Sequence, residues 1–341
     1  MQDYSDVPLS AISLDAIRAR AALLAPHVRE TPSIALDSPA LSPLLGGGAL
    51  FLKLECLQKT GTFKARGAMS VALSLPEDRR AAGLTAVSAG NHAIATAWAA
   101  RHIGAPAKVV MMSSANPFRV ARARAYGAEV VLVDGVAEAF AEAERLSRDE
   151  GLTFMHPYEG PFTTLGAAGV GLEFMTQVTG LDAVIVSVGG GGLISGVAAA
   201  VKQINPACKV YAVEPEGANS LGQSLSSGAP VKLDAVRTIA DSLGAPGCLP
   251  FSFRVNQAYV DEAVSLSDDQ ICGGVVICQE EAKLAVEPAA GAAMAAALGP
   301  LRSRLQGKRV GVLMCGANID ATGYGAILER GRDPALALLA P

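Results

Sequence analysis

Short apolar runs alternate with alanine-rich stretches along most of the chain. Six runs share the β-branched, apolar composition of buried strands: residues 84–90, 107–112, 129–135, 182–192, 209–215 and 308–318. Most of them lead directly into a stretch with helical periodicity. Near-continuous apolar strands that are each followed by a helix predict an α/β fold, with parallel sheet covered on both faces.

Glycines stand where several of the predicted helices end. Gly104, Gly127 and Gly151 each follow an alanine-rich stretch, at the position where a left-handed C-cap is easiest to form. The first helix is predicted to begin after Ser13, a good N-cap, and to continue to Leu24 with one apolar face. These boundaries indicate one compact α/β body.

Length and composition narrow the class of protein. At 341 residues, half of them apolar, the chain has room for a large core and two lobes. A net charge of −4 gives no basic surface for nucleic acid, and no apolar run approaches the roughly 18 residues that span a bilayer. The N-terminus lacks a signal pattern, and the six cysteines form no CxxC pair. We therefore expect a cytoplasmic protein with reduced thiols that binds neither nucleic acid nor membrane.

Four consecutive glycines, Gly189, Gly190, Gly191 and Gly192, separate a predicted strand from a predicted helix that begins near Leu193. Glycines expose backbone N–H groups, and a helix N-terminus adds partial positive charge, so the run is typical of a phosphate-binding loop. The spacing matches neither the dinucleotide fingerprint nor a P-loop. A tight structural turn is the alternative.

Lys64 lies in the stretch GTFKARGA, between two glycines, a phenylalanine and an arginine. An ordinary surface lysine is the alternative interpretation. A lysine that forms a Schiff base, together with a phosphate loop, would hold a cofactor with an aldehyde at one end and a phosphate at the other. Pyridoxal 5′-phosphate meets both requirements.

Several motifs in order resemble the serine/threonine dehydratase family of pyridoxal-phosphate enzymes, the fold-type II group with the tryptophan-synthase β-type fold. They are LKLECLQKTGTFKARGA, SAGNHAIATAWAA, GGGGL, VEPAAGAA and LMCGAN. The resemblance covers nearly the whole chain. It implies a two-lobed α/β fold, each lobe an open, mostly parallel sheet flanked by helices, with the cofactor in the cleft between lobes. The implied domains are a large cofactor-binding domain of residues 1–54 and 152–341 and a small domain of residues 55–151. We also expect a homodimer.

The resemblance also implies the roles of individual residues. The catalytic Schiff-base lysine is Lys64. The cofactor-binding residues are Phe63, Lys64, Asn91, Gly189, Gly190, Gly191, Gly192, Leu193, Glu287 and Cys315. The residues that bind the substrate carboxylate are Ser88, Ala89, Gly90, Asn91 and His92. An N-cap role is the alternative for Asn91. His156 lies in MHPYEG, which resembles a loop of the family, and both a substrate contact and a structural role remain open for it.

The activity implied is that of an ammonia-lyase. Such a dehydratase converts an L-3-hydroxy amino acid to a 2-oxo acid and ammonia by β-elimination, with Lys64 as general base. Ala167, Ala168 and Gly169 replace the Gln-Gly-Thr common in relatives, so we expect room for a β-substituent as bulky as that of 3-phenylserine. Cys315 replaces a serine or threonine near the pyridine nitrogen, and a thiol is a weak hydrogen-bonding partner.

The metal site of some relatives is incomplete in this sequence. Glu214 and the Ala218 carbonyl are present, but Ser220 stands where a carboxylate would complete the ligands. Because hard divalent cations favour charged oxygen ligands, we predict no tight metal site.

Three other functions remain open from the sequence. One is β-replacement of the cysteine-synthase type, and a second is a pyridoxal-phosphate-binding protein without turnover. The third is an amino-acid racemase. Ala89 argues against racemisation because its methyl group cannot supply the proton that relatives deliver from a serine at this position.

Overall fold

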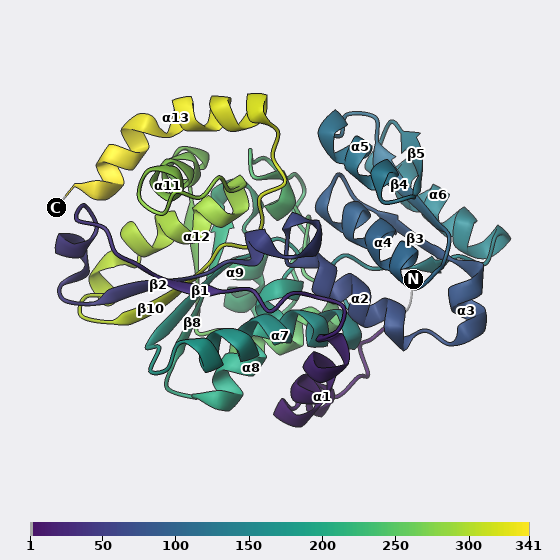
Figure 1. Ribbon diagram of the computed structural model, residues 1–341, viewed down its shortest axis with the longest axis horizontal. Coiled ribbons are helices and arrows are strands. Elements are labelled where there is room, and N and C mark those ends of the chain that lie inside the picture. The colour runs from purple at the N-terminus through teal and green to yellow at the C-terminus, as the bar shows by residue number, and fades with distance from the viewer. Residues whose placement is uncertain (1–2, 341) are drawn as a thin grey trace.

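The computed structural model describes residues 3–340, which form two α/β lobes, each built on its own sheet (Figure 1). The strands are β1 Ser33–Leu36, β2 Ala49–Lys53, β3 Leu84–Val87, β4 Ala107–Met112, β5 Glu129–Val133, β6 Thr153–Phe154, β7 Ala183–Ser187, β8 Lys209–Pro215, β9 Glu262–Leu266 and β10 Arg309–Leu313. The α-helices are α1 Leu14–Leu24, α2 Lys64–Ser74, α3 Glu77–Ala82, α4 Asn91–His102, α5 Pro117–Ala125, α6 Val136–Asp149, α7 Pro161–Gln177, α8 Gly192–Ile204, α9 Ser220–Ser227, α10 Pro250–Tyr259, α11 Asp268–Glu280, α12 Pro288–Leu298 and α13 Ala321–Leu339. Short 3₁₀ helices include η3 Glu55–Leu57, η4 Lys59–Gly61 and η6 Asp241–Leu243.

The larger lobe contains a six-stranded sheet in the order β1-β2-β10-β7-β8-β9. The β1–β2 pair is antiparallel, and the other strand pairs of this sheet are parallel. Helices α11, α12 and α13 lie over one face of this sheet, and α7 and α8 lie over the other (Figure 1). The sheet therefore joins the beginning of the chain to its end, because β10 pairs with β2.

The smaller lobe contains a four-stranded parallel sheet in the order β5-β4-β3-β6. Apolar residues of α4 pack against one face of this sheet, and apolar residues of α6 pack against the other. Both sheets confirm the predicted α/β class with mostly parallel sheet. The division into two domains stays a prediction. The pairing of β6 with β3 favours a boundary after residue 154 instead of 151. Residues 1, 2 and 341 of the predicted large domain lie outside the described residues.

Local capping explains where several helices begin and end. The Ser13 hydroxyl accepts a hydrogen bond from the Ala16 amide at the start of α1. Ser267 and Gln270 form a capping box at the start of α11. The glycines predicted to follow helices, such as Gly104 and Gly127, have φ values of +70° and +94°.

Buried alanine, valine and leucine residues dominate the cores of both lobes. The six cysteines are all free and buried. Within residues 3–340, no helix combines the length and apolar character needed to cross a bilayer.

Candidate active site

The carboxyl ends of three parallel strands open toward one region of the molecule. The chain leaves β7 at Ser187 into the glycine loop, and leaves β10 at Leu313 just before Cys315. In the other sheet it leaves β3 at Val87 into residues 88–90. Ligand sites of open α/β sheets lie at this edge.

A cavity, which we call the main cavity, lies at this edge. Its lining comprises Phe63, Lys64, Asn91, Tyr158, residues 187–194, Ser242, Leu243, Glu287, Ala289 and Cys315. The fold thus places together every residue expected to bind the cofactor, although these residues are spread over more than two thirds of the chain.

The glycine loop can hold a phosphate because its residues have no side chains to cover their N–H groups. The loop also packs closely against Tyr158. Gly191 adopts a left-handed conformation, with φ of +90°, directly before α8. A Cβ atom on Gly190 would lie 2.3 Å from the ring of Tyr158. The first N–H groups of α8 have no acceptor within the helix and suit an anion. The tight-turn interpretation is also correct in part, because the close packing by itself demands glycine.

Lys64 is the first residue of α2 and is half-buried. Its Nζ atom donates a hydrogen bond to the Pro157 carbonyl oxygen at 2.6 Å and lies 5.1 Å from the centre of the Phe63 ring. Burial lowers the pKa of Lys64 to about 8. The surface-lysine interpretation is therefore wrong, and the amine is poised to act as a base near neutral pH.

Glu287 is the centre of a hydrogen-bonded group that links the two lobes. The Asn91 amide donates to both of its carboxylate oxygens at 2.9 and 3.0 Å, and the Asn318 amide donates to the Asn91 oxygen at 2.9 Å. The Arg119 guanidinium lies 3.9 Å from Glu287. Burial raises the pKa of Glu287, and Arg119 opposes that change. The N-cap interpretation of Asn91 is wrong, because Gly90 occupies the N-cap of α4.

Arg119 makes further contacts across the cleft between the lobes. From α5 of the smaller lobe, it donates to the Asn318 carbonyl at 3.0 Å and forms an ion pair with Asp241 of η6. Arg119 was missed from the sequence because it belongs to no recognisable motif. Asn318 ends the motif LMCGAN, but no role was expected for it.

Cys315 is fully enclosed at the end of β10. The Ser187 hydroxyl lies 3.6 Å from its sulfur, and burial raises the pKa of the thiol. Cys315 is therefore a neutral thiol facing the main cavity, and Ser187 is a second polar neighbour that the sequence did not suggest.

The residues expected to bind the substrate carboxylate divide into two groups. Asn91 lines the main cavity, whereas Ser88, Ala89 and Gly90 do not. The Ser88 hydroxyl accepts a hydrogen bond from the Gly90 amide at 3.1 Å. His92 is buried and hydrogen-bonded to the Met155 carbonyl oxygen. Binding of a carboxylate by this loop stays a prediction.

A second, narrow cavity, which we call the side cavity, adjoins the main cavity at Phe63, Lys64 and Gly192. The rest of its lining is Gly67, Ala68, Val71, His92, Met155, His156, Pro157, Thr163 and Ala167. Ala167 therefore faces the site, as expected. The expectation for Ala168 is wrong, because Ala168 is fully buried on another face of α7, in a cluster with Ile12 and Phe251.

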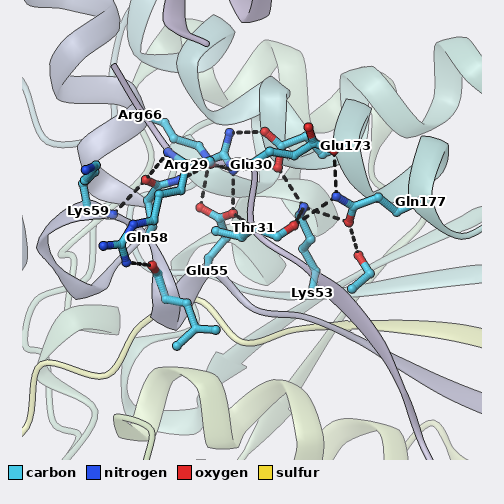
Figure 2. Close-up of polar contacts among 12 residues, drawn as sticks. Arg29, Glu30, Thr31, Lys53, Glu55, Gln58, Lys59, Arg66, Glu173 and Gln177 are labelled. Atoms are coloured by element: carbon cyan, nitrogen blue, oxygen red, sulfur yellow. Dashed lines mark hydrogen bonds and ion pairs between the residues drawn. The ribbon is translucent and has the colours of Figure 1, made fainter. Parts of the chain in front are cut away.

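Behind Lys64, a buried ionic network fixes α2 to its neighbours (Figure 2). The Arg66 guanidinium binds the carboxylate of Glu55 with two contacts of 2.8 Å. It also binds Glu173 of α7 at 2.6 and 2.7 Å, and Lys53 donates to Glu173 at 2.7 Å. These paired contacts are geometrically specific, so they hold the turn of α2 that carries Lys64.

The residues corresponding to the metal site of relatives form a different structure. The Glu214 carboxylate accepts hydrogen bonds at 2.8 Å from the amides of Leu221 and Gly222, in the first turn of α9. Its charge thus faces a helix N-terminus. Within residues 3–340, no cluster of three or more acidic, histidine or cysteine side chains could hold a metal ion.

Comparison with known proteins identifies the family. The model of the family described as pyridoxal-phosphate dependent enzyme matches residues 24–316. The chain belongs to this family. The pyridoxal-phosphate dependent enzyme described here is 48% identical over 318 residues to a phenylserine dehydratase of Ralstonia pickettii, covering 93% of this chain and 97% of that protein. It is 37% identical to an L-threonine ammonia-lyase of Thermotoga maritima, covering 84% and 71% of the two chains.

A solved structure of maize serine racemase is similar to this pyridoxal-phosphate dependent enzyme, with a TM-score of 0.88 and 34% identity. The match covers 95% of this chain and 98% of that chain. The fold-type II architecture expected from the sequence is thereby confirmed.

Pyridoxal phosphate is the cofactor of this enzyme, and the main cavity suits it. Lys64 would supply an amine for its aldehyde, and the glycine loop would supply N–H groups for its phosphate. Tyr158 closes one side of the loop, and the Cys315 thiol offers a weak polar neighbour.

Proposed function

We propose that this enzyme is an ammonia-lyase that converts L-3-hydroxy amino acids to 2-oxo acids and ammonia. The observation that carries the proposal is the position of Lys64, at the junction of the two cavities with a pKa lowered to about 8. Relatives named phenylserine dehydratase and L-threonine ammonia-lyase support the same reaction class. The first name describes loss of water and the second describes loss of ammonia, and both losses occur in the proposed β-elimination.

The roles of the protein groups follow from their positions. Bound pyridoxal phosphate supplies an electron sink that makes the substrate Cα–H acidic. The Lys64 Nζ atom, when neutral, accepts that proton. The hydrogen bond between Asn91 and Glu287 fixes the start of α4 beside the main cavity. The Arg66 network fixes α2, which carries Lys64. We propose that residues 88–92 bind the substrate carboxylate, which the N-terminus of α4 would favour.

A panel of 3-hydroxy amino acids tests the proposal. The purified holoenzyme should release 2-oxo acid and ammonia in equal amounts from L-serine, L-threonine or L-threo-3-phenylserine. Formation of cysteine from an activated serine and sulfide, without 2-oxo acid, would identify a β-replacement enzyme instead. A bound cofactor with no turnover of any of these compounds would contradict the proposal.

We also propose a cytoplasmic homodimer with two domains. Six free, buried thiols support a reducing compartment. Sedimentation equilibrium of the holoenzyme should give twice the mass of the chain.

A further inference from the structure

The side cavity lies beside Lys64. Its walls come mainly from α2, from α7, from His92 of α4 and from the segment Met155–Pro157 that follows β6, and it meets the glycine loop only at Gly192. The cavity therefore adjoins the reacting amine and, apart from Gly192, is lined by residues outside the phosphate-binding loop.

The walls of the side cavity carry no charge other than Lys64. Its two histidines are neutral, because burial lowers the pKa of His92 and of His156 to about 3. Their hydrogen bonds agree with this state. His92 Nε2 donates to the Met155 carbonyl at 2.7 Å, and His156 Nδ1 accepts from the Glu159 amide at 2.9 Å. A carboxylate placed here would lose its hydration without gaining a partner of its own.

Small side chains create the space between α2 and α7. The two helices approach so closely that a Cβ atom on Gly166 would lie 2.6 Å from the Arg66 carbonyl oxygen. The ionic contacts from Arg66 to Glu173 hold them at this separation. Only a truncated residue such as Ala167 therefore leaves room for a ligand.

We propose that the side cavity receives the β-substituent of the substrate, and that Ala167 and Val71 set its size. This inference rests on the proposed lyase function and names its substrate class, which is 3-hydroxy amino acids with an uncharged, apolar β-substituent such as phenyl. An aromatic ring gains from burial against these apolar walls. A β-carboxylate, as in 3-hydroxyaspartate, is rejected.

The test compares L-threo-3-phenylserine, L-threonine and L-threo-3-hydroxyaspartate with the holoenzyme and three variants. Ala167→Leu fills the cavity, Val71→Ala widens it, and Thr176→Leu adds the same side chain at the exposed end of α7. The measured quantity is the phenylserine-to-threonine ratio of kcat/KM. The visible absorbance of the bound cofactor reports whether each variant is intact.

Ala167→Leu should lower that ratio roughly 30-fold or more, a size discrimination typical of apolar pockets. Val71→Ala should raise kcat/KM for a para-substituted phenylserine relative to phenylserine, and Thr176→Leu should change neither ratio. If Ala167→Leu does not retain cofactor, the change in kcat/KM for the para-substituted phenylserine in Val71→Ala tests the inference by itself.

Equal losses for both substrates in Ala167→Leu, or no effect of Val71→Ala on the larger substrate, would overturn the inference. So would a wild-type enzyme that prefers 3-hydroxyaspartate. Failure of the lyase function itself would look different, since no 3-hydroxy amino acid would then yield a 2-oxo acid.

Discussion

At the scale of single residues, the proposed role of Lys64 as the base makes turnover depend on the protonation of its amine. The amine must be neutral to take the Cα proton, and its pKa is lowered to about 8. We therefore expect kcat to rise with pH and to level off above about pH 8. Lys64→Ala should lose both the visible cofactor absorbance and measurable 2-oxo acid release, whereas Lys308→Ala, at an exposed position, should retain both. Full activity in Lys64→Ala would show that another group is the base.

Ala89 determines a second prediction, which concerns stereochemistry. Its methyl group cannot return a proton to Cα from the side opposite Lys64, so elimination should dominate over racemisation. Chiral analysis of recovered L-serine should find little D-serine beside the 2-oxo acid. Ala89→Ser should increase exchange at Cα more than it increases elimination. Substantial D-serine from the wild-type enzyme would mean that a different residue provides the opposite-face acid.

Site residues could be predicted from the sequence where their immediate neighbours in the chain are distinctive. Lys64 and the glycine loop are recognisable because their neighbours are unusual, and the fold brings them to one cavity as expected. Tyr158 and Arg119 gave no such signal, since their importance comes from contacts between distant segments. Ala167 and Ala168 are adjacent in the sequence, and only the rotation of α7 decides which one faces the site.

At the scale of secondary-structure elements, strand prediction depended on burial. The confirmed strands β4, β7 and β8 are nearly continuous apolar runs, because both faces of each strand are covered. The strands β1, β2, β6 and β9 were not predicted. β1, β6 and β9 lie at sheet edges and are largely half-exposed, so their sequences lack a continuous apolar run. β2 is an interior strand, so edge exposure does not account for that miss.

Helix α9 provides a pH-dependent test of stability. Burial raises the pKa of Glu214 to about 7, above its ordinary value of 4.5. The folded state therefore binds this proton more tightly than the unfolded state, and stability from this site is lost as pH rises from about 5 to 8. Glu214→Gln cannot ionise. The free energy of unfolding of the wild type should thus fall relative to the variant by up to roughly 3 kcal/mol over that range.

Urea unfolding of both proteins at pH 5 and pH 8 measures this difference. The comparison cancels the titration of all other groups, because only residue 214 differs. A difference that does not change with pH would show that Glu214 ionises equally in the folded and unfolded states.

At the scale of the whole molecule, contacts across the cleft hold the lobes together. The ion pair of Arg119 with Asp241 links α5 to η6, and Asp241 is half exposed. Because solvent screens such a pair, we expect Asp241→Asn to weaken the contact between the lobes by only about 1 kcal/mol. This corresponds to a rise in KM of roughly fivefold, with a smaller change in kcat. Asp269→Asn breaks an exposed pair with Arg330 far from the cleft and serves as the control. Equal changes of KM in the two variants would argue against a role of the Arg119–Asp241 pair in holding the lobes together.

The pairing of β2 with β10 also orders events during protein synthesis. All strands of the smaller sheet have left the ribosome soon after Phe154 is made, so that lobe can form while the chain is still growing. In the larger sheet, β2 cannot pair with β10 until Arg309–Leu313 has emerged, more than 250 residues after Lys53. Until β10 is made, the edge of β2 that pairs with β10 is exposed, and unpaired strands of this kind are bound by chaperones. Nascent chains stalled before β10 should therefore resist protease in the smaller lobe and remain cleavable near residues 49–53.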